Sequence, residues 1–264
     1  MKRLFCLLIA CMISIMLVAQ TEKVKKSQIR KRQIDYMESV SNVHIKQYLP
    51  AEKLYNDGRK WFYRKKPREL ASLIASAEQG YAKAQSLLGY IFASKQAKEL
   101  NFYDEELSKK WYSKAHEGFM KLLDEKDTDA MKELGDMYRI GNLQFAKDTV
   151  LAEKYYRMGA EQGSAGCQLW LGQLLREKGK KEEALSWLLK SAEKEHGWAA
   201  FLVGQMYENG EGTQKDIPKA IEWYTKSANT NSSYADDSRK ALKRLGQPVP
   251  EISHPHIPTQ LQPK

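Results

Sequence analysis

Few residues in this sequence could carry catalysis, and their spacing matches no familiar catalytic arrangement. The chain lacks the Gly-x-Ser-x-Gly, His-Glu-x-x-His, phosphate-loop and dinucleotide-binding patterns. Adjacent carboxylates such as Glu182 and Glu183 carry no weight for acid–base chemistry in a chain with 33 acidic residues. The histidines are scattered, at His44, His116, His196, His254 and His256. We therefore predict a protein that is not an enzyme.

Metal and cofactor chemistry has little support in the sequence. His254 and His256 flank one proline and could hold a metal ion weakly, but an unstructured tail is the stronger interpretation of that segment. Cys6 and Cys11 fall in an apolar N-terminal run, so Cys167 is the one cysteine left beyond it. Cys167 occupies the place of a small residue such as Ala84, which favours buried packing over a nucleophile. We expect no disulfide, no cofactor and no metal site.

The stretch Val203–Ala228 is the clearest structural unit in the chain. Two amphipathic segments flank a glycine-rich turn, and Asp216 followed by Pro218 is typical of a helix start. Trp223 and Tyr224 then recur at helical spacing after Ala220. A single helical hairpin of this kind cannot bury its own apolar face, so it needs neighbours of the same kind.

Copies of this hairpin recur along the chain. A leucine or valine followed by glycine marks each first segment, at Gly89, Gly135, Gly172 and Gly204. An aromatic pair or its remnant marks each second segment, at Trp111-Tyr112, Tyr155-Tyr156, Trp187-Leu188 and Trp223-Tyr224. We expect each glycine to let two helices approach closely, and the aromatic pairs to fill the space between adjacent hairpins. Each large buried side chain contributes about 1.5–3 kcal/mol.

This pattern resembles the Sel1-like repeat, a relative of the tetratricopeptide repeat. Residues 203–228 match the family motif at nearly every marked position, 130–163 match well, and 82–118 and 165–197 match in part. Three departures stand out: a turn through Lys178–Lys180, a first turn replaced by Ala93–Asp104, and an extra segment at Phe119–Lys126. The resemblance implies an all-α fold, a right-handed α-solenoid of stacked antiparallel helical hairpins.

The N-terminus suggests export. Lys2 and Arg3 precede an apolar run that ends at Ala19, which is short for a membrane-spanning helix of about 20 residues. We interpret residues 1–20 as a signal peptide cleaved near Ala19 or Gln20. An uncleaved membrane anchor and lipidation at Cys11 remain alternatives. The expected location is the periplasm or envelope of a bacterium, with an N-terminally anchored or a secreted protein as alternatives.

Three further segments follow. Residues 21–47 form a basic arm or capping helix, for which a solvated face is favoured over a nucleic-acid-binding arm. Residues 48–246 form the repeat solenoid, with about four to five hairpins, a degenerate first repeat over 48–80 and a C-terminal capping helix. Residues 247–264 hold five of the eight prolines and form a disordered tail.

The resemblance also implies a binding face lined by first helices, as in tetratricopeptide proteins. The positions after each marked glycine, and three residues further on, would line it: Tyr90, Asp136, Gln173 and Gln205, then Ala93, Arg139, Arg176 and Glu208. Trp198 is a candidate anchor, because aromatic residues and arginine are favoured where binding energy concentrates. Each of these side chains is equally well explained as a solvated helix position.

The function that we expect is an exported, non-enzymatic scaffold that binds a protein or peptide on this concave face. The net charge of +10 suits an acidic partner, but we expect no nucleic-acid partner and no stable membrane span after signal cleavage. One alternative is a cell-envelope hydrolase, directed at cell-wall material or β-lactams, built on the same repeats. Another is an adaptor at the luminal face of a eukaryotic secretory membrane.

Overall fold

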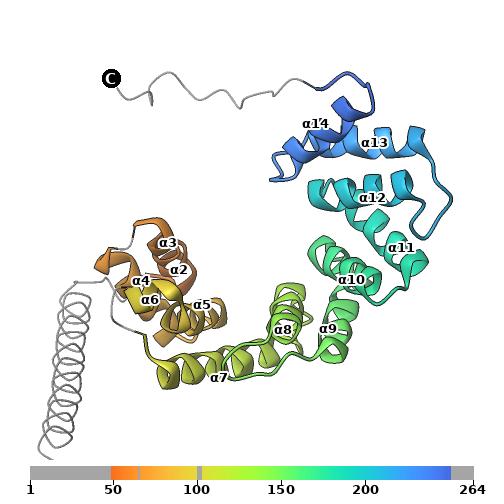
Figure 1. Cartoon of the computed structure of the whole chain (residues 1–264). Helices are drawn as coiled ribbons and strands as arrows, with labels where there is room; N and C mark the ends of the chain where they lie inside the picture. Colours follow the sequence, from red (N-terminus) through yellow and green to blue (C-terminus); the bar gives the residue numbers. More distant parts are fainter. Residues whose placement is uncertain (1–48, 65, 100–102, 251–264) are drawn as a thin grey trace, which may run out of the picture. The chain divides into compact units, whose positions relative to one another are not determined.

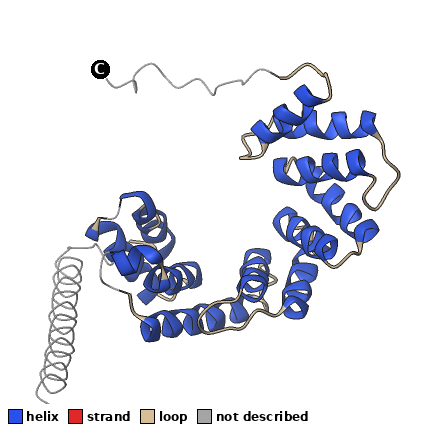
Figure 2. Ribbon diagram, in the orientation of Figure 1, coloured by secondary structure: helices blue, strands red, loops and turns tan. Residues whose placement is uncertain are grey.

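The computed structural model describes residues 49–64, 66–99 and 103–250, and within these ranges the chain is helical with no strand (Figure 2). The all-α solenoid predicted from the repeats is thus confirmed. Within the same ranges, no helix has the length and apolar character needed to cross a membrane. The predicted signal peptide, the basic arm 21–47 and residues 251–264 of the predicted tail lie outside the described residues.

The chain groups into two compact units, and the array predicted over 48–246 has residues in both of them. The first unit comprises the described residues up to Lys121 together with Asn142–Ala146, and the second comprises Leu122–Gly141 and the chain from Lys147 onwards. The first unit holds, in chain order, α2 (Ala51–Gly58), α3 (Trp61–Arg64), α4 (Pro67–Glu78), α5 (Ala82–Ala93), α6 (Lys95–Glu99) and α7 (Glu105–Leu122).

The second unit stacks three complete hairpins and a final helix. Its elements are α8 (Thr128–Ile140), α9 (Thr149–Glu161), α10 (Ala165–Glu177), α11 (Lys181–Ala192), α12 (Gly197–Asn209), α13 (Ile217–Ala228) and α14 (Ala235–Arg244). Figure 1 shows the first helices α8, α10 and α12 on one side of this stack and the second helices α9 and α11 on the other. The predicted capping helix is α14, which packs on α13 and α12.

The marked glycines sit where the two helices of a hairpin touch, as predicted. A Cβ added at Gly204 would lie 2.7 Å from the ring of Tyr224, and one at Gly89 would lie 2.8 Å from Tyr112. Gly58 faces Leu73 in the same way, so α2 and α4 form the degenerate first hairpin expected over 48–80. The second member of each aromatic pair thus packs inside its own hairpin, rather than between hairpins as expected.

Two kinds of buried hydrogen bond repeat through the array. Within a hairpin, a serine near the end of the second helix donates to the carbonyl of the first residue of the first helix: Ser76 to Ala51, Ser191 to Ala165 and Ser227 to Gly197. Between hairpins, a glutamine donates to the last alanine of the preceding helix: Gln85 to Ala77 and Gln168 to Ala160. These bonds fix the register of helices that apolar packing alone would let slide.

One expectation about the irregular segments needs correction. The extra segment at Phe119–Lys126 is in its first half the last turn of α7, because Phe119 is fully buried and extends the apolar face of that helix. His116 lies within α7, and its ring stacks on that of Phe145 with 4.8 Å between the ring centroids. The replaced turn Ala93–Asp104 contains the short helix α6.

Candidate functional site

The predicted binding positions divide between the two units. Tyr90 lies on α5 of the first unit and is 52 % exposed, and Ala93 ends the same helix. The other predicted residues lie on the first helices α8, α10 and α12 of the second unit. We call this set of partly exposed side chains, with its neighbours on the same helices, the first-helix face.

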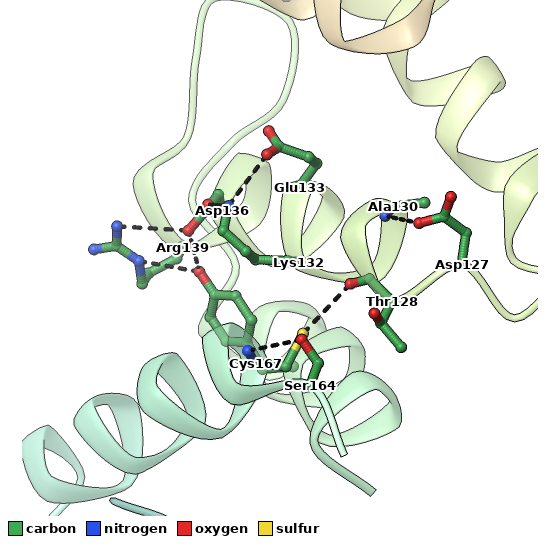
Figure 3. Close-up of polar contacts among 10 residues, drawn as sticks. Asp127, Thr128, Ala130, Lys132, Glu133, Asp136, Arg139, Ser164 and Cys167 are labelled. Atoms are coloured by element: carbon green, nitrogen blue, oxygen red, sulfur yellow. Dashed lines mark hydrogen bonds and ion pairs between the residues drawn. The ribbon is translucent and has the colours of Figure 1, made fainter. Parts of the chain in front are cut away.

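Asp136 and Arg139 on α8 belong to one polar cluster (Figure 3). The carboxylate of Asp136 accepts from the Tyr156 hydroxyl at 2.6 Å and from the Lys132 ammonium at 2.9 Å, and Arg139 Nε donates to the same hydroxyl at 3.2 Å. Burial, and then the charge of Asp136, raise the pKa of Tyr156, so this hydroxyl stays protonated and acts as a donor. Both predicted residues are therefore held in place by α9.

Arg176 on α10 reaches the turn of the next hairpin. Its guanidinium forms two hydrogen bonds of 2.7 Å with the carboxylate of Glu211, which follows α12. The bonds from Arg176 are the main reason that the pKa of Glu211 is lowered. A bidentate pair of this kind is stronger and more rigid than a single contact, so it ties α10 to the α12–α13 turn.

Glu208 plays the corresponding part at the end of α12. It accepts two hydrogen bonds from Arg244 of α14, at 2.6 and 2.9 Å, and one of 2.7 Å from the Tyr224 hydroxyl. These bonds, led by those from Arg244, hold the pKa of Glu208 below its ordinary value. Four of the predicted positions, Asp136, Arg139, Arg176 and Glu208, thus make polar contacts within the chain.

The two glutamines among the predicted residues differ from these. Gln173 on α10 and Gln205 on α12 are partly exposed, and neither side chain forms a hydrogen bond with any described residue. An amide offers both a donor and an acceptor, which suits the main chain of a bound polypeptide. Both stay predictions as partner-binding residues, but their polar groups are available.

An aromatic row joins these helices, and the sequence analysis found one of its members. The Trp198 ring meets that of Trp170 edge-on and stacks on that of Tyr234, with 4.9 Å between the ring centroids in both pairs. The ring centroids of Phe201 and Tyr234 are 5.5 Å apart. The guanidinium of Arg139 lies over Trp170 at 4.2 Å. All four rings are partly exposed. Trp170 stands two residues before Gly172, and Phe201 stands three residues before Gly204. The two rings thus occupy different positions of the repeat, which gave no signal for them.

A shallow pocket of about 420 Å³ opens between α12 and α14. Gln205 and Glu208 line it, and it is completed by Phe201, Asn209, Tyr224, Asp237, Lys240, Ala241 and Arg244. The pocket places the free amide of Gln205 beside charged groups of both signs. It is the part of the first-helix face where predicted residues meet in a concave site.

Reactive groups in the described part of the chain offer little chemistry. Cys167 is buried as predicted, and burial raises the pKa of its thiol to about 11, which disfavours the nucleophilic thiolate. His196 lies at the start of α12, and burial lowers its pKa. In the described residues no three His, Cys, Asp or Glu side chains come together as a metal site.

Comparison with known proteins finds one curated relative and several solved structures that resemble this chain. A yeast chitin synthase regulator from Saccharomyces cerevisiae, SKT5, is 29% identical over 118 residues, which cover 42% of this chain and 16% of that protein. The structure of c5321, a protective antigen of uropathogenic Escherichia coli with an SLR fold, gives a TM-score of 0.51 at 25% identity and covers 76% of this chain and 43% of that one. The chain thus spans less than half the length of either protein.

A Sel1 repeat protein from Oxalobacter formigenes gives a TM-score of 0.47 at 27% identity, covering 76% of this chain and 78% of that one. The model of the Sel1 repeat matches residues 82–117, 128–164, 165–196 and 199–231. These segments include most of each helix from α5 to α13, with the marked glycines and the rings or the leucine that they contact. Because the four matches cover more than half of the sequence, the chain belongs to the Sel1 repeat family.

Proposed function

We propose that this protein is an exported, non-enzymatic adaptor that holds a protein partner on the first-helix face of its second unit. Sel1 repeats are in general scaffolds for protein–protein interaction. The yeast relative is named as a regulator of an enzyme, which fits a protein that acts through another protein. Beyond this general role, we propose which face of this chain binds the partner, which of its residues take part, and that the protein is exported.

The proposal rests on a contrast between two groups of side chains on one face. Some are fixed by contacts within the chain, and others have polar groups that a partner could bind. Arg139, Arg176 and Glu208 are fixed by contacts within the chain, so the backbone around them is rigid. Gln173 and Gln205 stand three residues before Arg176 and Glu208 and have no described hydrogen-bond partner. A rigid surface with available polar groups binds at a low cost in conformational entropy.

Trp198 and its aromatic neighbours add an apolar area to the same two helices that carry the glutamines. The rings already pack on one another, so contact with a partner would bury apolar surface without ordering flexible side chains. We therefore place the centre of the interface at Trp198 and include in it Gln173 of α10 and Gln205 of α12.

Site-specific photo-crosslinking in native cells tests the proposed face. A photoreactive residue at Gln173 or Gln205 should capture a partner protein, whereas the same residue at Ser186, exposed on the second helix α11, should not. Capture from Ser186 alone, or equally from all three positions, would contradict the assignment. Turnover of cell-wall fragments or a β-lactam by the purified protein, if lost in Gln205→Ala, would favour the hydrolase instead.

Export needs a separate experiment. We expect the protein from fractionated cells to begin at Gln20 or Thr21 and to be found with the periplasmic fraction. Recovery in the membrane fraction with Met1 retained would show that the apolar N-terminal segment anchors the protein, and recovery in the cytoplasm would contradict export.

A further inference from the structure

A second concave site lies away from the first-helix face, between the C-terminal ends of α11 and α13. Its cavity volume is about 740 Å³, within the range of about 300–1,000 Å³ that ligand sites usually have. Its lining residues come from the ends of these two helices, the loops that follow them, and α12: Ala192, Glu193, Glu195, Ala200, Trp223, Lys226, Asn229, Thr230 and Asn231. The volume exceeds what one side chain would fill.

The charge of this pocket is negative, in contrast to the basic balance of the whole chain. Glu193 and Glu195 are exposed, and neither pairs with a described basic side chain. Lys226, the basic residue of the lining, is already neutralised by Glu222 at 2.6 Å. Two helix C-termini face the same space, and the helix dipole makes such ends partly negative. The pocket therefore favours a cation.

The aromatic wall of the pocket also accepts a cation. The ammonium of Lys226 lies over the ring of Trp223, 4.0 Å from its centroid. Lys226 is exposed, so its ammonium can move away from the ring at small cost. The face of an indole is the strongest aromatic site for an ammonium or guanidinium group.

Glu195 occupies a backbone position that two other junctions in the chain give to glycine. The residue two places before each of α5, α8, α10 and α12 has a positive φ, and before α5 and α10 it is glycine, Gly80 and Gly163, with φ of 87° and 88°. At the start of α12 it is Glu195, with φ of 61°, and at the start of α8 it is Lys126, with φ of 57°. A side chain is disfavoured at such a φ. Glu195 therefore places a carboxylate at a position where glycine would fit the backbone better.

We propose that this pocket binds a lysine or arginine side chain within a basic segment of a partner polypeptide. The cationic group lies between the carboxylates of Glu193 and Glu195 and against the ring of Trp223. The side-chain amides of Asn229 and Asn231, which bond to no described residue, pair with the main chain beside the bound residue. A segment of peptide, rather than a single side chain, accounts for the size of the cavity.

Nuclear magnetic resonance on the full chain gives a direct test with simple probes. The probes are a short glycine–serine peptide with one central lysine, the same peptide with that lysine acetylated, and free lysine amide. We expect the lysine peptide to shift the indole N–H signal of Trp223 in a saturable manner at millimolar concentration. The acetylated peptide should leave this signal in place, and free lysine amide should bind more weakly.

Three variants sharpen the test. Glu195→Gly should weaken binding of the lysine peptide about tenfold or more, as expected for loss of a charge-assisted contact, without lowering the melting temperature. Lys126→Gly is the matched control, since it makes the same backbone change at the other strained junction and should leave binding unchanged. Lys226→Gln removes the competing cation and should strengthen binding.

Four results would overturn the proposal. They are a Trp223 signal that no probe shifts, an equal response to the acetylated peptide, unchanged binding in Glu195→Gly, and equal or tighter binding of free lysine amide. The last result would make the pocket a site for small ammonium compounds instead of a peptide. The pocket contains none of the residues predicted for the first-helix face. A failure of the lysine peptide to bind would therefore not bear on the crosslinking test of that face.

Discussion

At the residue scale, Trp223 is one of the large buried side chains of the second unit. It is 8 % exposed and packs with the large apolar cluster that runs from α8 to α13. We expect Trp223→Ala to lower the free energy of unfolding by about 3–5 kcal/mol, because the cavity would be only partly filled by its neighbours. Chemical denaturation measures this value, and the partly exposed Trp187→Ala should cost less. An unchanged midpoint for Trp223→Ala would contradict the buried role.

Glu208 gives a prediction about pH. Its pKa lies below the ordinary value of 4.5, first because Arg244 donates to it, so the folded state is favoured while the carboxylate is ionised. This contribution is complete above the unfolded pKa and is lost as the pH falls through the folded pKa. Glu208→Gln should therefore flatten the fall in melting temperature below about pH 4.5. Glu182→Gln, exposed on α11, is the control, and a parallel fall in both variants would contradict the assignment.

At the element scale, the second helix α9 is stabilised by a side-chain cap at its first turn. Asp148 accepts from the backbone N–H groups of Val150 and Leu151, at 2.9 and 3.0 Å, at the start of α9. Asp148→Ala should cost about 1 kcal/mol of stability, while Asp148→Asn should retain most of it, since asparagine also caps a helix. Thermal unfolding of the two variants measures the difference. Equal losses would show that the charge of Asp148, not its hydrogen bonds, stabilises α9.

The regular elements could be predicted from the sequence because local rules set them. The glycine of each first helix and the aromatic or leucine residue of each second helix gave the hairpins, and Asp216 was correctly placed as the cap of α13, where it accepts from Lys219 N–H at 3.0 Å. The end of α7 was missed, although Phe119 follows Ala115 at helical spacing and is fully buried. The repeat pattern ends before Phe119, so it gave no signal that the helix continues.

At the scale of the whole molecule, the second unit is a stack in which each hairpin touches mainly its neighbours. The Arg176–Glu211 pair joins α10 to the α12–α13 turn. We expect Arg176→Met to raise amide hydrogen exchange in α12 and α13 but to leave α8 and α9 unchanged, because the lost contact lies at one junction. Uniformly faster exchange in all these helices would mean that the unit opens only as a whole.

The candidate sites were harder to predict than the fold, and for a physical reason. The repeat pattern marks positions by their place in one helix, and so it identified Gln205 and Glu208, which share a pocket. The aromatic row and the anionic pocket are formed by residues such as Tyr234 and Glu195, which stand in junctions outside the repeated positions. Their importance comes from which helices meet, and one sequence does not contain that information directly.

The serine bonds inside the hairpins bear on how such a chain can change its length over evolutionary time. Ser191 and Ser227 each donate a hydrogen bond to the first residue of their own hairpin. A gene segment that encodes one whole hairpin therefore encodes both partners of this bond when it is duplicated or deleted. The contacts that must be formed anew lie between hairpins, such as the glutamine bond from Gln168 to Ala160. Related genes should therefore differ by whole hairpins more readily than by single helices.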